Sequence, residues 1–278
     1  MEAPELVALL QDRRTAVLTG AGMSTDSGIP DYRGPDSPPS NPMTIRQFTS
    51  DAAFRQRYWA RNHLGWRHMD QTMPNAGHRA LAALQRAGIV NGVITQNVDL
   101  LHTKAGSPGV IDLHGSYARV VCLDCGHTMT RTALADLLEQ ANPGFAARAA
   151  TLGGIAVAPD ADAMVSDTAS FRIVDCPRCG GMLKPDIVYF GESVPKARVD
   201  QAYSLVDSAD ALLVAGSSLT VYSGFRFVRH AAAKGMPVAI INRGPTRGDD
   251  LADVKIDTGC SPMLALLADE LPALASSA

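Results

Sequence analysis

The sequence predicts an α/β protein with a Rossmann-like, doubly wound parallel sheet and a smaller module inserted into it. Short apolar runs alternate with helical segments along most of the 278 residues, which is the order of a sheet whose strands are joined by crossover helices. The apolar runs are also continuous, as burial of a strand on both faces requires. The alternation breaks between Cys122 and Cys179, which indicates that the inserted module lies there.

The composition is that of an ordinary globular protein, with 46% apolar residues, 19% charged residues and a formal net charge of −3. This charge gives no electrostatic reason to expect nucleic acid as a partner, and no apolar run is long enough to cross a bilayer. The first five residues are acidic and lack the features of a secretory signal. We therefore expect a cytoplasmic protein, or a protein of the mitochondrial matrix if a presequence has been removed, without membrane or nucleic-acid partners.

The first predicted elements are a short helix, a buried strand and a glycine loop. Leucines at helical spacing predict a helix over 4–12, and an apolar run predicts a strand over 16–19. Gly20 and Gly22 have no Cβ, so the backbone can turn sharply there and approach a ligand closely. Residues 23–27 are expected to begin a helix whose free N–H groups face an anion such as pyrophosphate.

The rest of the chain alternates between predicted helices and strands. A loop rich in Pro, Ser and Gly is expected over 34–43, and helical structure over 44–69. Asn75 is expected to cap a helix that ends before Gly88. The remaining predicted strands are 90–95, 110–113, 186–190, 211–215, 237–241 and 254–257. The remaining predicted helices are 195–208, 223–234 and one at the C-terminus.

Polar residues follow five of the predicted strands. These strand ends are Gly20–Gly22, Gln96–Asp99, His114–Gly115, Gly216–Ser218 and Asn242–Arg243. Any one of them could be a cap or a turn. In an open parallel sheet, however, the carboxyl ends of the strands meet at one edge, where ligands bind. Together they predict a large polar ligand, and a dinucleotide is our hypothesis.

The glycine loop by itself is a weak signal, because Thr25 stands where a dinucleotide-binding fingerprint has its third glycine. Asp31, Tyr32 and Arg33 follow it in a loop stiffened by Pro30, and a routine turn does not need that mixture of groups. A nicotinamide dehydrogenase would also have an acidic residue roughly 20 residues beyond the glycines. The region 40–46 offers none, which argues against that activity.

His114 is the candidate base. It ends an apolar strand at the predicted ligand edge and is followed by Gly115, which is expected to leave its ring accessible. Imidazole titrates near neutral pH, so it can take a proton from a hydroxyl group. The alternative is a purely structural histidine.

Four of the five cysteines form two Cys-x-x-Cys pairs, Cys122 with Cys125 and Cys176 with Cys179. Four thiolates fill a tetrahedral zinc shell and leave no position for water, so we expect one structural Zn²⁺. A redox dithiol is the alternative. The residues between the pairs, 126–175, have no predicted role.

Several segments resemble the sirtuins, NAD-consuming protein deacylases and ADP-ribosyltransferases. They are GAGMSTDSGIPDYRG from Gly20, TQNVDLLH from Thr95, DLHG from Asp112 and KPDIVYFGE from Lys184, and the resemblance covers about residues 5–270. It implies an NAD-dependent protein lysine deacylase that transfers the acyl group of lysine to ADP-ribose and releases nicotinamide. A protein mono-ADP-ribosyltransferase and an NAD-binding adaptor without turnover remain alternatives.

The resemblance also implies roles for individual residues. His114 is implied as the base, and Asn97 as the second catalytic residue. Those implied to bind NAD are Gly20, Ala21, Gly22, Thr25, Asp31, Tyr32, Arg33, Gln96, Asn97, Asp99, Gly216, Ser217, Ser218, Asn242, Arg243 and Cys260. For Cys260, a buried apolar thiol is the alternative. Val188, Phe190, Gly191 and Glu192 are implied to bind the acyl-lysine peptide, with 216–227 as the opposite wall.

Two further segments, 55–62 and 221–227, are most similar to the class II, sirtuin 4-like branch of the family. Tyr58 and Arg61 stand at i and i+3 on one predicted helix face, and a tyrosine–arginine pair of this spacing holds acidic acyl groups in a related class. We therefore expect acyl groups such as glutaryl to be accepted. The alternative is that Arg61 is a solvated charge on the helix.

The predicted domain organisation combines these results. The Rossmann-like, NAD-binding domain is expected to comprise residues 1–33, 70–120 and 184–278. A smaller domain is expected to comprise a helical and loop part, 34–69, and the zinc-binding module, 121–183.

Overall fold

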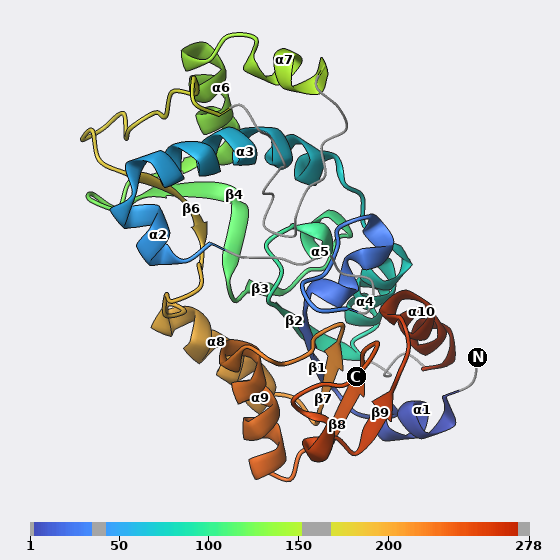
Figure 1. Cartoon of the computed structure of the whole chain (residues 1–278). Coiled ribbons are helices and arrows are strands. Elements are labelled where there is room, and N and C mark those ends of the chain that lie inside the picture. Colours follow the sequence, from blue (N-terminus) through green and yellow to red (C-terminus); the bar gives the residue numbers. More distant parts are fainter. Residues whose placement is uncertain (1–2, 35–42, 152–167, 272–278) are drawn as a thin grey trace.

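The computed structural model describes residues 3–34, 43–151 and 168–271. Its larger part is built on a six-stranded sheet in which every strand pair is parallel (Figure 1). The strand order is β3-β2-β1-β7-β8-β9, so the chain changes direction across the sheet between β1 and β7. The strands are β1 (Thr15–Thr19), β2 (Val90–Thr95), β3 (Val110–Asp112), β7 (Ala211–Ala215), β8 (Val238–Ile241) and β9 (Val254–Ile256). This doubly wound sheet confirms the predicted fold class.

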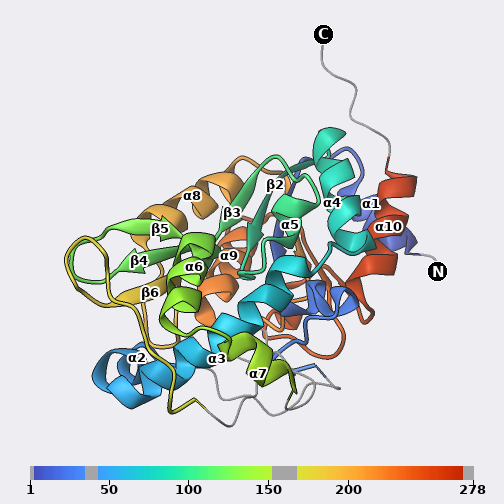
Figure 2. The same ribbon diagram turned by 90° about the horizontal axis from the view of Figure 1, so that it is seen from above.

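Helices cover both faces of the large sheet (Figures 1 and 2). α1 (Pro4–Leu10), α4 (Ala76–Arg86) and α10 (Cys260–Glu270) pack on one face. α8 (Lys196–Asp207) and α9 (Tyr222–Ala233) pack on the other. Successive side chains of a strand point to opposite faces, so Val17 of β1 belongs to the first core and Leu18 to the second. Both side chains are fully buried, which explains the continuous apolar runs.

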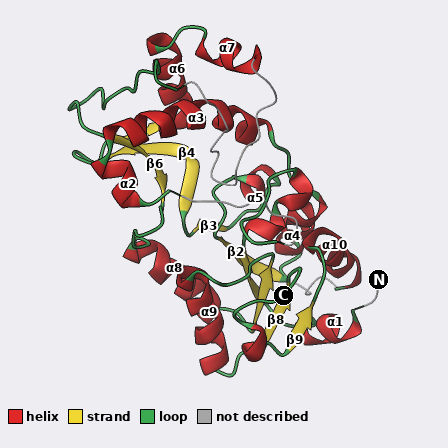
Figure 3. Cartoon of the chain, in the orientation of Figure 1, coloured by secondary structure: helices red, strands yellow, loops and turns green. Residues whose placement is uncertain are grey.

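A separate three-stranded antiparallel sheet forms the smaller part of the molecule, and Figure 3 shows the two groups of strands apart. Its order is β5 (Thr128–Thr130), β4 (Gly115–Cys122) and β6 (Leu183–Ile187). α2 (Ile45–Ser50), α3 (Ala52–Gln71) and α6 (Arg131–Ala141) share a hydrophobic core with this sheet. The remaining helices are α5 (Leu101–Lys104) and α7 (Phe145–Thr151).

Most predicted elements are present within a residue or two of their expected bounds, and Asn75 caps α4 as predicted. The helical region predicted over 44–69 is two helices that meet at Asp51, whose carboxylate accepts a hydrogen bond from the Phe54 N–H at 2.9 Å. Of the loop predicted over 34–43, residues 35–42 lie outside the described part of the chain, as do residues 152–167 of the segment between the cysteine pairs.

The prediction that a helix begins at residues 23–27 is wrong. The segment forms two short 3-10 turns, Ala21–Met23 and Thr25–Ser27, and Gly28 ends the second with a left-handed φ of 85°. The N–H groups of Met23, Ser24 and Ser27 are bonded within these turns, so they are not free for an anion.

The strand predicted over 186–190 is also displaced. β6 begins at Leu183 and pairs with β4 of the small sheet instead of joining the parallel one. Residues after Ile187 leave the sheet because Phe190 exchanges backbone hydrogen bonds with Met43 and Ile45. The predicted domain boundaries stay a prediction. Within the described residues, no helix combines the length and the apolar character that a membrane crossing requires.

Candidate active site

A cavity of about 910 Å³ lies at the carboxyl edge of the large sheet, where the loops after β1, β2, β7 and β8 meet the segment after β6. Most of the predicted site residues line it. Those predicted for catalysis or NAD are Gly20, Ala21, Gly22, Asp31, Tyr32, Arg33, Gln96, Asn97, Asp99, His114, Gly216, Ser217, Ser218, Asn242 and Arg243. Those predicted for the peptide are Val188, Phe190, Gly191 and Glu192.

Apart from the zinc ligands, four predicted site residues are not among the described residues that line this cavity. The Thr25 hydroxyl donates to the backbone oxygen of Gly22 at 3.1 Å, so it serves the loop itself. Cys260 is buried at the start of α10, and burial raises the pKa of its thiol to about 12. Tyr58 is buried in the core, with its ring edge-on to Tyr189, which does line the cavity. Arg61 lies one turn further along α3.

The two glycine loops interlock at the point where the strand order reverses. The Gly22 N–H donates to the backbone oxygen of Gly216 at 2.9 Å. A Cβ on Gly20 would lie 2.8 Å from that same oxygen, and a Cβ on Gly216 would lie 2.3 Å from the Met23 nitrogen. These glycines are therefore required by backbone packing between the loops, in addition to any approach of a ligand. Gly216 also has a left-handed φ of 68°, which disfavours other residues.

His114 is held by both ring nitrogens. Its Nδ1 lies 2.9 Å from the backbone oxygen of Gln96, and its Nε2 lies 2.7 Å from Ser223 Oγ. A carbonyl oxygen can only accept, so Nδ1 carries the proton and Nε2 accepts from the Ser223 hydroxyl. Burial, assisted by the positive charges of Arg198 and Arg226, lowers the pKa of His114 to about 4. The imidazole is therefore neutral at pH 7 and available as a base.

His114 lines the cavity, and Gly115 is required for a reason that the sequence did not indicate, the path of the backbone. Its φ is 84°, and a Cβ there would lie 2.0 Å from the backbone oxygen of Asp186. The glycine is needed because the chain, having left the large sheet after β3, begins β4 here and passes directly against β6.

Asn97 and Asp99 belong to one hydrogen-bonded group. The Asn97 amide donates to the backbone oxygen of Gly20 at 3.0 Å and to Ser24 Oγ at 3.1 Å. The Ser24 hydroxyl donates to Asp99 Oδ2 at 2.6 Å, and the Leu101 N–H donates to Oδ1 at 2.9 Å. Burial raises the pKa of Asp99, and these hydrogen bonds oppose that effect. The loops after β1 and β2 are thus held together at the cavity floor.

A series of buried hydrogen bonds continues from Asn97 into the protein interior. The Asn97 N–H donates a hydrogen bond to Thr95 Oγ1, which also lies within hydrogen-bond distance of the Thr19 hydroxyl. The Thr19 hydroxyl in turn lies 3.0 Å from His102 Nε2. The His102 ring packs edge-on against His78, with 4.7 Å between centroids. Burial lowers the pKa of His78 to about 4 and the pKa of His102 well below its ordinary value. Both rings are therefore neutral supports of the site.

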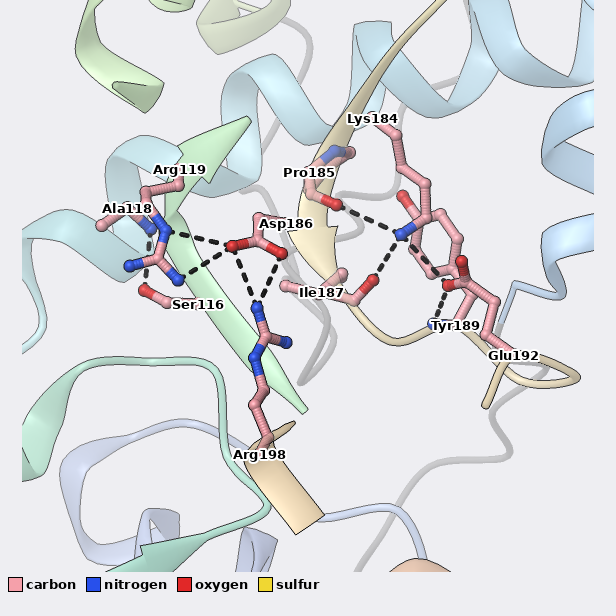
Figure 4. A network of polar contacts seen from close by, with 10 residues as sticks. All are labelled: Ser116, Ala118, Arg119, Lys184, Pro185, Asp186, Ile187, Tyr189, Glu192 and Arg198. Atoms are coloured by element: carbon pink, nitrogen blue, oxygen red, sulfur yellow. Dashed lines mark hydrogen bonds and ion pairs between the residues drawn. The ribbon is translucent and has the colours of Figure 1, made fainter. Parts of the chain in front are cut away.

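A buried lysine shapes the wall that follows β6 (Figure 4). Lys184 Nζ lies 3.1 Å from Glu192 Oε2 and 4.6 Å from the centroid of the Tyr189 ring. The same carboxylate oxygen accepts a hydrogen bond from the Tyr189 N–H at 2.6 Å. The Glu192 carboxylate is therefore engaged within the wall, although the residue borders the cavity.

The neighbouring ion pairs join the two sheets (Figure 4). Asp186 of β6 accepts hydrogen bonds from Arg119 of β4, at 2.8 Å, and from Arg198 of α8, at 2.9 Å. Arg198 belongs to a helix of the large sheet, whereas Asp186 and Arg119 belong to the small one. This bridge lies beside Gly115, where the chain passes from one sheet to the other.

The four cysteines of the two pairs converge as predicted, with their sulfur atoms within 4.8 Å of one another. The Sγ atoms of Cys122 and Cys179 are 3.5 Å apart, and those of Cys125 and Cys176 are 3.9 Å apart. Tetrahedral zinc with bonds of about 2.3 Å needs sulfur separations of about 3.8 Å, so the donor set fits Zn²⁺. Both knuckles end in a glycine of left-handed φ, Gly126 and Gly180.

Sequence reasoning missed several residues of the cavity, including Ser24, Ser223, Tyr189 and Arg226. Ser24 lies within the glycine loop, so its position could have suggested a role. Ser223 and Arg226 share one face of the first turns of α9, and the segment 216–227 was predicted only as a whole. Nothing local in the sequence indicates that Ser223 reaches His114.

Comparisons with known proteins agree with this geometry. The family model described as Sir2 family matches residues 20–223. NAD-dependent protein deacetylase 1 of Mycobacterium avium is 76% identical, over 98% of this chain and 97% of that protein. The mitochondrial NAD-dependent protein lipoamidase sirtuin-4 of Bos taurus is 45% identical, over 95% of this chain and 86% of that protein. A solved structure of Sir2 with a p53 peptide and NAD+ is 32% identical with a TM-score of 0.77, covering 97% of this chain and 98% of that one.

Proposed function

Because the chain belongs to the Sir2 family and is an NAD-dependent protein deacetylase, we propose that NAD and an acylated lysine peptide meet in the cavity at the carboxyl edge of the large sheet. One observation supports this above all: the cavity joins His114 and Asn97 to the interlocked glycine loops at the reversal of strand order. Such a reversal is where open α/β sheets bind nucleotides. Solved relatives with 29 to 32% identity hold acetylated or propionylated peptides or a p53 peptide with NAD+.

In this proposal NAD supplies the ADP-ribosyl group that receives the acyl group from lysine. His114 takes a proton at Nε2 from a ribose hydroxyl, in the place where Ser223 Oγ lies now. Asn97 and Asp99 orient the nicotinamide end, because Ser24 and Gly20 fix their side chains at the cavity floor. The segment Val188–Glu192 forms one wall for an extended peptide, which can add to the protein as a further strand.

The zinc ligands act at a distance from this chemistry. With Cys122, Cys125, Cys176 and Cys179 all bound to one ion, no position remains for a reacting water. We assign to them only the folding of the small sheet, to which β4 contributes Cys122.

We further propose that the protein belongs to the class II, sirtuin 4-like branch and accepts acyl groups that are longer or more acidic than acetyl. The identity of 45% with a lipoamidase of that name supports this proposal. The wall residue Tyr189 rests on Tyr58, with ring centroids 5.8 Å apart, and Arg61 follows on α3. An acyl chain that displaces Tyr189 would thus approach the tyrosine–arginine pair.

The test is a panel of peptides that carry acetyl-, glutaryl- or lipoyl-lysine, assayed for nicotinamide release and for products by mass spectrometry. We expect release to require an acyl peptide and to yield O-acyl-ADP-ribose. His114→Ala should lower kcat by about 10² to 10⁴, whereas His68→Ala, at an exposed position of α3, serves as the matched control. Labelling of a protein with ADP-ribose, without deacylation, would contradict the proposal.

Arg61→Ala tests the acyl preference separately. We expect it to lower kcat/KM for glutaryl-lysine more than for acetyl-lysine, with Arg57→Ala, an exposed residue of the same helix, as control. A preference for acetyl-lysine that survives the Arg61 substitution removes this part of the proposal.

A further inference from the structure

Arg226 is a charged residue of the cavity wall that, besides helping to lower the pKa of His114, has no acidic partner among the described residues. It lies in the first turns of α9, three residues after Ser223, and lines the cavity. Within the part of the chain that the structure describes, its guanidinium makes no hydrogen bond and no ion pair, and its Nε is buried without a partner. A partly buried guanidinium without a counter-ion is unfavourable, so this group is suited to bind an anion from outside.

The position of the guanidinium indicates where that anion would come from. Helical side chains lean toward the N-terminus of their helix, and Arg226 Cζ accordingly lies over the ring of Tyr222, 5.2 Å from its centroid. Tyr222 lines the same cavity and is 49% exposed, so the guanidinium lies against a ring that solvent and a bound peptide can reach. Phe190, which borders the cavity from the segment after β6, is 39% exposed. A peptide between these two walls would pass along the Arg226 guanidinium.

The acidic group of the facing wall does not neutralise Arg226. The Glu192 carboxylate is bound by Lys184 at 3.1 Å and by the Tyr189 N–H at 2.6 Å. The other arginines that line the cavity, Arg33 and Arg243, belong to the loops proposed to hold NAD. Among the described residues that line the cavity, Arg226 is therefore the positively charged one beside the walls proposed for the peptide.

We propose that Arg226 binds the carboxylate of an aspartate or glutamate that neighbours the acylated lysine in the protein substrate. The inference rests on the proposed function, because it assumes that the peptide occupies the walls around Phe190 and Tyr222. Arginine suits this role, since its planar guanidinium pairs with a carboxylate through two parallel hydrogen bonds and can stack on an aromatic ring at the same time. A carboxylate on the acyl group itself offers the same chemistry, and the experiment separates the two sources.

The experiment compares pairs of acetyl-lysine peptides that differ only in Glu or Gln at one position, scanned from two residues before to two residues after the modified lysine. For the wild-type protein we expect kcat/KM at one position to be about fivefold higher with Glu than with Gln, the effect of one partly exposed ion pair. Arg226→Gln should bring this ratio to one, and Arg226→Lys should restore part of it. Arg229→Gln, an exposed residue three positions further along α9, should leave the ratio at its wild-type value.

A third set of peptides carries glutaryl-lysine between neutral neighbours. The inference is overturned if Arg226→Gln changes the glutaryl-to-acetyl ratio but not the Glu-to-Gln ratio, or if wild type shows no preference for Glu at any position. Because each result is a ratio within one protein, a variant of lower overall activity still gives an answer. Absence of turnover with every acyl peptide would instead refute the proposed function, since the wild-type protein with neutral acetyl peptides tests that alone.

Discussion

The partner of His114 Nε2 is a serine hydroxyl, 2.7 Å away. Because Nδ1 donates to the Gln96 carbonyl, the two contacts fix both the tautomer and the plane of the ring. The serine hydroxyl therefore occupies the lone pair of Nε2 that a base must use.

Because a ribose hydroxyl must take the place of Ser223 Oγ at Nε2 in the proposed reaction, we expect Ser223→Ala to raise kcat/KM for NAD about fivefold, the value of one neutral hydrogen bond of about 1 kcal/mol. Ser223→Thr, which keeps the hydroxyl, should stay near the wild-type value, and Ser204→Ala, on the exposed side of α8, is the control. Initial rates at several NAD concentrations measure the effect. A lower kcat/KM in Ser223→Ala would show that the hydroxyl orients the base during the reaction and is not displaced.

The buried histidines predict how stability depends on pH. Burial lowers the folded-state pKa of His78 to about 4 and of His102 well below 6.5, so between about pH 4 and 6.5 the unfolded chain binds more protons than the folded one. Stability should therefore fall as the pH drops through this window, by about 1 kcal/mol per pH unit for each such histidine. Urea unfolding at pH 7.5, 6 and 5 measures this slope.

The His102→Gln variant should show a shallower slope, whereas His68→Gln, at an exposed position, should keep the wild-type one. Equal slopes in all three proteins would mean that His102 titrates in the folded protein with the same pKa as in the unfolded chain.

At this scale the sequence predicted the residues that stand directly at strand ends, such as Gln96, Asn97 and His114. Their positions follow from local order, since a parallel sheet brings its carboxyl ends together. Ser223 and Arg226 could not be predicted individually, because only the packing of α9 against the sheet brings them to the cavity.

Among the elements, the two cysteine knuckles are the clearest case of folding that depends on a bound ion. Each is a tight turn whose glycine N–H bonds back to the first cysteine, Gly126 to Cys122 and Gly180 to Cys176. The second knuckle leads directly into β6, and the first follows β4. Without an ion, four sulfur atoms within 4.8 Å of one another have no bond to hold them.

Zinc removal with a chelator, or Cys176→Ser, should therefore unfold the small sheet while the large sheet persists, because metal binding and folding are linked. Hydrogen exchange should increase in β4, β5 and β6 and remain slow in β1 and β7. Re-addition of Zn²⁺ should reverse the change in the chelated protein. Slow exchange in β4 to β6 after complete zinc removal would contradict this expectation.

Two elements were predicted in the wrong form, for reasons that propensity does not reveal. Residues 21–27 form 3-10 turns because Gly28 adopts a left-handed conformation and ends the second turn. β6 joins the small sheet through its pairing with β4, which depends on contacts between distant segments. The central strands of the large sheet were predicted closely because strands buried on both faces consist of continuous apolar runs, which can be recognised in the sequence.

For the whole molecule, the passage between the two sheets is the critical point. Gly115 has a φ of 84°, and a Cβ there would lie 2.0 Å from the Asp186 oxygen. Gly235, at the end of α9, has a similar φ of 68° but an open environment, with no atom within 4 Å of a Cβ.

Gly115→Ala should therefore lower the free energy of unfolding by several kcal/mol, through both strain and overlap. Gly235→Ala should lower it by only about 1 kcal/mol, through strain alone. Urea unfolding of both variants measures the difference. Equal losses would show that the contact with Asp186 relaxes without cost.

One consequence follows from the chain path at this passage. β3 ends at Asp112 and β4 begins at Gly115, so Leu113 and His114 are the whole connection between these two strands of different sheets. A rotation of the small sheet against the large one would strain the contacts of His114 with Gln96 and Ser223, and the Asp186–Arg198 bridge opposes that rotation.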